Sequence, residues 1–220
     1  MAVELVGRIG EGFAGDGGER SVRLSKDLAT VTTALHGKYY EQTLRGRVFS
    51  QSATPLGLAI PIYTATAIAG GMPIWNPPNS GVNVVPLFVS CGYGSGTADY
   101  GSIGIMARRL QAIATGEIMT ALANTTPFNG LVFGGQGSKT LSSNAGTCTV
   151  SAGVAGDWVR TFFSMNLEAQ TGTAHALTVA QIDLEGSLII PPGTLAYLAA
   201  TKATTALYAS TVVWEEVPIS

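Results

Sequence analysis

Residues Gly186–Ala200 read GSLIIPPGTLAYLAA, and this stretch decides the predicted fold. Ser187–Ile190 is a short apolar run rich in isoleucine, which favours a strand. The Pro-Pro-Gly sequence at 191–193 predicts a turn, because proline fixes φ and glycine tolerates the positive φ of tight turns. Leu195–Leu198 resumes the apolar run, so the whole stretch is predicted to be a strand, a turn and a second strand.

Residues Ala206–Glu215 read ALYASTVVWE and predict a partner strand. Two sets of side chains alternate along it, Leu207, Ala209, Thr211 and Val213 against Tyr208, Ser210, Val212 and Trp214. A period of two residues is typical of a strand with two different faces. Together with the preceding stretch it predicts an antiparallel β fold.

The rest of the chain repeats this pattern of short apolar runs between turn signals. Further strand candidates are Arg47–Ser52, Leu58–Tyr63, Val82–Gly92, Gly101–Ala107, Leu131–Phe133, Thr147–Ser151, Trp158–Met165 and Ala176–Ile182. Pro61 cannot donate to a β-ladder, so its run is expected at an edge or a bulge. Arg108–Ala123 has some helical spacing, but Gly116 interrupts it, and helix, strand and loop all stay open. About ten short strands favour a sandwich or a barrel.

The composition suggests a protein that works in an assembly. Hydrophobic residues make up 46% of the 220 residues and charged residues only 12%, against about 25% charged in ordinary domains. A surface so poor in charge is hard to keep soluble as a monomer, so we expect contacts with other subunits. The net charge of −2 gives no electrostatic reason to expect nucleic acid.

The sequence predicts neither membrane insertion nor secretion. No apolar run approaches the roughly 20 residues of a transmembrane helix, and the N-terminus lacks the pattern of a signal peptide. We therefore expect the chain to be made in the cytoplasm and not exported. Cys91 and Cys148 are therefore expected as buried free thiols, with a disulfide as the alternative.

Charge is concentrated at the N-terminus, where residues 1–47 hold 13 of the 26 charged residues. This shift predicts an extended or partly ordered arm, residues 1–45, and a sandwich body, residues 46–220. Six basic residues are the candidate contacts to a partner: Arg8, Arg20, Arg23, Lys26, Arg45 and Arg47. They lie among six acidic residues, which suits a protein surface better than nucleic acid, although an ordinary solvated tail explains them equally well.

No complete catalytic or metal-binding pattern is visible. Gly10–Gly15 reads GEGFAG and matches GxGxxG, but residues 16–18 (Asp-Gly-Gly) will not continue the helix that a dinucleotide site needs. His36 and His175 are the two histidines, and neither has a histidine or cysteine at ligand spacing. We expect no metal, no cofactor and no enzymatic activity, although a Ser-His-Asp triad stays open because triads are assembled in space.

The carboxylates near the C-terminus are not expected to be catalytic. Glu215 and Glu216 are adjacent in a strand and therefore point to opposite faces, so they are not a catalytic pair. Asp183 and Glu185 share a face but border a turn. We expect them to be solvated strand ends, as carboxylates usually are.

Three groups of residues resemble the jelly-roll decoration (cement) proteins of tailed-phage capsids. They are Leu58–Pro78 (LAIPIYTATAIAGGMPIWNPP), VVPLFVSCGYGSG at 84–96, and the C-terminal pattern EGSLIIPPGT and YASTVVWEEVPI at 185–194 and 208–219. The resemblance implies a polar arm, an eight-stranded jelly-roll-like antiparallel sandwich and a homotrimer. It also implies a non-enzymatic role on the capsid exterior of the virion, between subunits of the major capsid protein.

Two other functions remain as alternatives. A receptor-binding or glycan-binding head of a phage tail or fibre would use the same fold, with Trp75 and Trp158 as candidates for stacking on sugars. The second alternative is an enzyme built on a β-sandwich, but the sequence shows no set of catalytic residues for it. The hypothesis taken forward is a capsid decoration protein.

Overall fold

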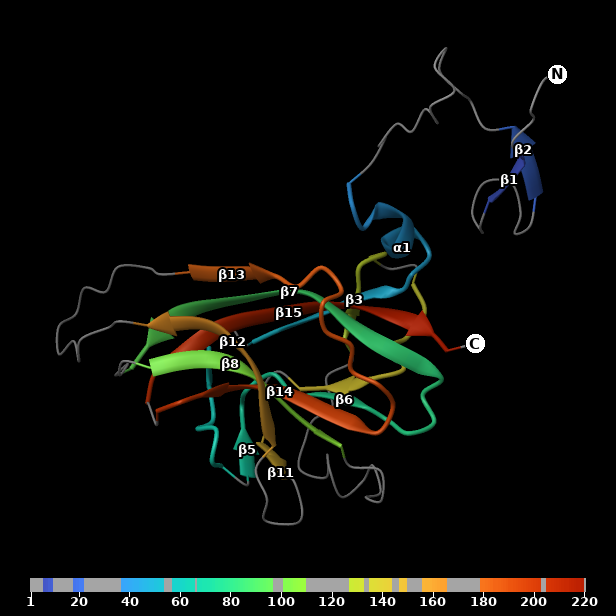
Figure 1. Ribbon diagram of the computed structural model, residues 1–220. Helices are drawn as coiled ribbons and strands as arrows, with labels where there is room; N and C mark the ends of the chain where they lie inside the picture. Colours follow the sequence, from blue (N-terminus) through green and yellow to red (C-terminus); the bar gives the residue numbers. More distant parts are fainter. Residues whose placement is uncertain are drawn as a thin grey trace.

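The computed structural model describes residues 6–9, 18–21, 37–53, 57–65, 67–96, 101–109, 127–132, 135–143, 147–149, 156–165, 179–202 and 205–219. Two antiparallel sheets face each other in a β-sandwich (Figure 1). The predicted all-β antiparallel sandwich is therefore confirmed.

The larger sheet has six strands. Its order is β13 (Val179–Asp183), β7 (Val82–Ser95), β15 (Leu207–Pro218), β3 (Val48–Ser52) and β9 (Phe128–Asn129), and β4 (Leu58–Ala59) pairs with β15 outside this path. The smaller sheet has the order β10 (Leu141–Ser142), β6 (Ile74–Asn76), β14 (Thr194–Ala200), β8 (Gly101–Arg109) and β12 (Asp157–Met165). A separate pair consists of β5 (Ala67–Ala69) and β11 (Thr147–Thr149).

The connectivity is that of a jelly roll. The eight main strands form nested pairs. The first, β3, pairs with the last, β15, and the pairs inside it are β6 with β14, β7 with β13 and β8 with β12. This is one long antiparallel ribbon. It folds over so that β15 lies beside β7 in one sheet and β14 beside β8 in the other. Eight strands in two such sheets make the double Greek key of a jelly roll.

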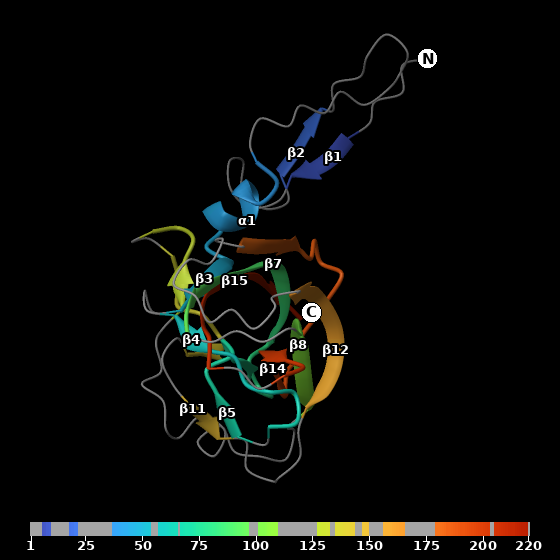
Figure 2. The same ribbon diagram turned by 90° about the vertical axis from the view of Figure 1, so that its left-hand side faces the viewer.

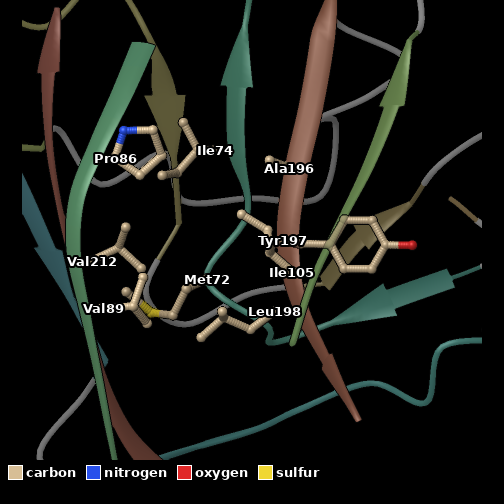
Figure 3. Close-up of a pocket in the computed structure, with 9 residues that line it drawn as sticks. All are labelled: Met72, Ile74, Pro86, Val89, Ile105, Ala196, Tyr197, Leu198 and Val212. Carbon is tan, nitrogen blue, oxygen red and sulfur yellow. The ribbon is translucent and has the colours of Figure 1, made fainter. Parts of the chain in front are cut away.

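The alternation in β15 determines which side chains enter the core. Tyr208, Ser210, Val212 and Trp214 are buried, while the residues that alternate with them are exposed or half-buried. Trp214 stacks on Phe49 of β3 with ring centroids 6.3 Å apart. The apolar interior leaves a cavity of only about 10 Å³ between the sheets (Figure 3), which is about the space of one water molecule. Between the described residues that line it, this cavity has no room for a ligand larger than a water molecule.

Two predicted strands are wrong, each for a physical reason. Ser187–Ile190 is not a strand: only Ile190 pairs, in a bridge to Val84 of the larger sheet. The turn at 191–193, with Gly193 at φ +76°, then carries the chain across to β14 in the smaller sheet. The stretch at 186–200 is thus a crossover between layers, and the alternation of apolar residues could not reveal which sheet each run joins.

The second wrong strand is Leu131–Phe133. The pairing residues come earlier, at β9, while Leu131 and Val132 lie in the following turn and Phe133 is outside the described residues. The side-chain amide oxygen of Asn129 accepts a hydrogen bond from the Leu131 amide (2.8 Å), which favours the turn over a longer strand.

The remaining strand predictions agree with the structure where it describes them, and residues 150–151 and 176–178 of two predicted strands lie outside the described residues. The run with Pro61 pairs through β4 before the proline, and after it only through an isolated parallel bridge between Ile62 and Ala200. It forms no continuous ladder across the proline, as the missing donor predicts. Pro86 lies inside β7, where it pairs with Trp214 at a register shift, so the ladder is interrupted there in any case. Most of Arg108–Ala123 lies outside the described residues, and its first two residues complete β8.

The predicted arm contains two described parts. β1 (Val6–Ile9) and β2 (Gly18–Ser21) form a two-stranded antiparallel sheet apart from the sandwich (Figure 1), and the GxGxxG match falls outside the described residues. Helix α1 (Tyr40–Leu44) lies over the outer face of the larger sheet (Figure 2). Just before it, Lys38 pairs with Glu185, and the Tyr39 hydroxyl donates to Asp183 (3.3 Å).

Cys91 is a buried free thiol in β7, as predicted. Burial raises its pKa to about 11, although a hydrogen bond from Ser210 opposes the shift. The thiol is thus protonated and unreactive at neutral pH. The side chain of Cys148 lies outside the described residues.

Candidate functional site: a basic pocket at one end of the sandwich

A pocket of about 230 Å³ lies at the end of the larger sheet where β3 and β7 begin and β15 ends. Three basic residues line it: Arg45, Arg47 and Lys139. Phe49, Val82, Gln136, Gly137, Glu216 and Pro218 complete most of the wall. We call this region, with the apolar side chains described below, the basic end.

Local structure explains how the two arginines reach the pocket. Helix α1 ends at Leu44, and Arg45 is its C-cap residue. Gly46 then takes φ +68°, a left-handed conformation that favours glycine and turns the chain into β3. Arg47 lies two positions before Phe49, whose side chain is buried in the sandwich. Side chains two apart in an extended segment share a face, so the Arg47 side chain lies on the inner side of the larger sheet, at its end.

Lys139 is held by a buried carboxylate. Glu216 is only 5% exposed, and it accepts hydrogen bonds from the Ser138 hydroxyl (2.5 Å) and from the backbone amides of Lys139 (2.9 Å) and Thr140 (3.2 Å). The Thr140 hydroxyl donates as well (3.1 Å). These charge-assisted hydrogen bonds fasten the 138–140 segment to the last strand and leave the Lys139 ammonium exposed.

The cations of the pocket are only partly neutralised by the chain itself. Arg45 lies 3.7 Å from Glu41, whose side chain is 68% exposed, and its Nε is buried with no hydrogen-bond partner in the described structure. Within the described ranges, neither Arg47 nor Lys139 forms a salt bridge. Because the Glu216 carboxylate already accepts four donors, it has little remaining capacity to bind these cations.

Glu215 affects the same region from the opposite face of β15. Burial raises its pKa above the ordinary value, and the charges of Arg47 and Arg45 lower it by a smaller amount. The sequence-based prediction that Glu215 and Glu216 face different sides is confirmed, because one is half-buried and the other fully buried. Desolvation therefore outweighs the attraction of the two arginines at this carboxylate.

Apolar side chains gather on the segments that border the pocket. Among the described residues nine large hydrophobic side chains are exposed, and six belong to α1, to β9 and its turn, and to the end of β15. They are Tyr40, Leu44, Phe128, Val132, Val217 and Ile219. Phe128 is 74% exposed and Val132 70%, so these two are almost fully in contact with solvent.

The structure brings together only two of the six candidate contact residues. Arg45 and Arg47 line the pocket, whereas Arg8 and Arg20 lie on the separate β1–β2 sheet. Arg23 and Lys26 fall outside the described residues.

Two pocket residues were missed by the sequence analysis, Lys139 and Glu216. Extending the alternation of Tyr208, Val212 and Trp214 by one step points Glu216 inward, and that signal was available. Lys139 had no local signal, because Glu216, which holds it, is 77 residues away.

The other residues considered from the sequence do not form a site. Trp75 is completely buried, so it cannot stack on a sugar. Trp158 is half-buried, meets Tyr63 edge to face and donates its indole N–H to Thr161 (3.1 Å). Asp183 and Glu185 are exposed, as predicted. His36 and His175 lie outside the described residues.

A second pocket, of about 290 Å³, lies between β8, β12 and the crossover segment 188–191. Its walls are mostly apolar, with Arg108, Arg109 and Asp157 at the strand ends. In the part of the chain that the structure describes, no group of three or more His, Cys, Asp or Glu side chains is placed to hold a metal ion. Nor does any helix there have the length and apolar character needed to cross a membrane.

Comparison of the chain with protein-family models, with curated proteins and with solved structures gave no match. The functional assignment therefore depends on the geometry of the basic end.

Proposed function

We propose that the chain is a virion structural protein that decorates the exterior of a tailed-phage capsid and stabilises it by binding between subunits of the major capsid protein. The observation that carries the proposal is the basic end, where six exposed apolar side chains lie on or next to the segments that border a pocket lined by three cations. Aromatic residues and arginine are enriched at protein interfaces, whereas an ordinary solvated surface has little reason to gather them.

The position of this surface suits a clamp. Residues 38–47 run from the turn after β13, across the outer face of the larger sheet, to the start of β3, so the arm meets the body at the basic end. A partner bound there would contact both. Each 100 Å² of apolar area buried in such a contact contributes about 2.5 kcal/mol before the costs of association.

We further propose that the protein forms a homotrimer and acts without a catalytic step. The charge-poor composition supports self-association, because charged residues are only 12% of the chain. Light scattering of the purified protein should then give about three times the chain mass of 22.6 kDa. The proposed partners are other copies of the chain and the major capsid protein, with no nucleic acid or membrane contact.

The test is cosedimentation with expanded, undecorated heads of the phage that carries the gene. We expect saturable binding with a fixed number of copies per head. The double variant Phe128→Ser, Val132→Ser should bind about tenfold more weakly or worse, because it removes the two most exposed apolar side chains of the basic end.

The matched control is Val159→Ser, Ile189→Ser, which removes two exposed apolar side chains elsewhere. This variant should bind heads like the unmodified chain. Absence of saturable binding by the unmodified protein would refute the capsid role. Equal weakening by both double variants would show that the basic end is not the contact surface.

A further inference from the structure

We propose that the basic pocket is a receptor for a carboxylate side chain, a glutamate or aspartate presented by a protein partner. The inference rests on the proposed function for the identity of the partner, a capsid subunit. Its recognition chemistry rests on the pocket alone, which Arg45, Arg47 and Lys139 line. Two guanidinium groups and an ammonium form a donor set that suits a carboxylate, because arginine binds both of its oxygens at once.

Three carboxylates lie near these three cations, but of the three cations only Arg45 forms a salt bridge among the described residues. Glu216 is engaged by hydrogen bonds from the 138–140 segment, and Glu215 attracts the two arginines from the other face of β15. Glu41 is highly exposed, so its interaction with Arg45 is screened by solvent. The Nε of Arg45 is buried without a hydrogen-bond partner in the described structure, so the chain itself does not use all the donors of this guanidinium.

The dimensions of the site fit a side chain. The pocket volume of about 230 Å³ exceeds the roughly 30 Å³ that one water molecule occupies in the liquid. A carboxylate with its methylene stem therefore fits together with a few waters. Phe49 and Val82 form part of the wall and would contact the methylene groups.

The surroundings favour a carboxylate on a protein over a free inorganic anion. Leu44, Phe128 and Ile219 are exposed apolar side chains on the segments that border the pocket. A docked protein would cover them and exclude water from the ion pairs, which strengthens those pairs. A small free anion would leave the apolar side chains exposed and gain nothing from them.

The test uses two peptides as probes, N-acetyl-Gly-Glu-Gly-Leu-amide and its Gln counterpart, with inorganic phosphate as a third probe. Binding to the isotope-labelled full chain is followed by NMR at the backbone amides of Arg47, Gly137 and Lys139. We expect the Glu peptide to shift these signals in a saturable way and the Gln peptide to leave them unchanged. Phosphate binding tighter than the Glu peptide would overturn the proposal in favour of a free-anion site.

Variants that each remove one positive charge test which residues bind the Glu peptide. Arg47→Gln and Lys139→Gln should each weaken Glu-peptide binding about tenfold or more. Lys139→Gln retains the backbone amide that binds Glu216, so it keeps the fold even if the arginine variant does not. The control is Lys202→Gln, with the same charge change at an exposed position beside Gly101, at the opposite end of the sandwich. Equal loss in all three variants would refute a specific receptor.

Head binding separates the two proposals. If unmodified protein binds heads and Lys139→Gln binds them equally well, the capsid role stands and the carboxylate receptor is refuted. If the Glu peptide binds as expected but heads do not bind, the receptor stands and the capsid role is refuted.

Discussion

The inner face of β15 differs sharply between the middle of the sandwich and its basic end. In the middle, Val212 shares a cavity of only about 10 Å³ with Ile105 and Leu198 of the opposite layer, and the fully buried Trp214 stacks on Phe49. One step further along the same face, Glu216 is just as buried but accepts hydrogen bonds from four donors. Burial thus serves two purposes on one strand: apolar packing joins the sheets, and a satisfied carboxylate positions a surface segment beside a cationic pocket.

The largest expected loss of stability follows a substitution in the middle of the sandwich. Trp214→Ala removes a side chain with no solvent exposure that stacks on Phe49. We expect a loss of about 3–5 kcal/mol in the free energy of unfolding, because a large cavity is left in the core. Urea denaturation followed by circular dichroism measures it, with the exposed Val217→Ala as control. A loss below about 1 kcal/mol would mean that the two layers are not joined by this residue.

An intermediate effect is expected at the basic end. Glu216→Gln keeps the size of the side chain but replaces one carboxylate oxygen by an NH₂ group, and it removes the charge that strengthens the hydrogen bonds from the amides of Lys139 and Thr140. We expect a loss of about 1–3 kcal/mol. Hydrogen exchange should also accelerate at those two amides and stay unchanged in the middle of β15. Uniform acceleration along the strand would erase the distinction between the two regions.

The smallest expected change in stability concerns Glu215, and it depends on pH. Its folded-state pKa is raised, mainly by burial, so ionisation of this carboxyl at neutral pH opposes folding. Below the ordinary pKa of 4.5 the group is protonated in both states, and this cost is absent. Glu215→Gln should therefore stabilise the fold at pH 7 and not at pH 3.5.

The gain from Glu215→Gln should stay below about 1 kcal/mol, because the group is partly exposed and its interactions are screened. Denaturant titrations at the two pH values measure it. Destabilisation at pH 7 would mean that attraction to Arg47 and Arg45 outweighs burial at this position, contrary to the direction of the pKa shift.

The fold class was predictable because β15 and β14 carry local signals. Alternation in Ala206–Glu215 identified a two-faced strand, and the Pro-Pro-Gly turn marked a change of direction. Such signals describe only neighbouring residues. The assignment of Ile190 to one sheet and of Thr194 to the other depends on pairing with distant strands, so it could not be predicted.

The candidate site was predictable only in part for the same reason. Arg45 and Arg47 stood out because charge is rare in the body that follows them. Lys139 joined them only through the hydrogen bonds of its segment to Glu216. The general expectation that carboxylates are exposed concealed this residue, although the alternation along β15 pointed it inward.

The pairing of β3 with β15 also has a consequence for biosynthesis. Ser52 and Thr211 share a hydrogen bond across 159 positions of sequence, and β15 lies between β7 and β3 in the larger sheet. The ribosome makes β15 after every other strand of the sandwich. Until it emerges, β3 and β7 of the nascent chain have unpaired edges that invite association with neighbouring chains. Folding must therefore be completed after translation of this strand, and a truncated product would be prone to aggregate.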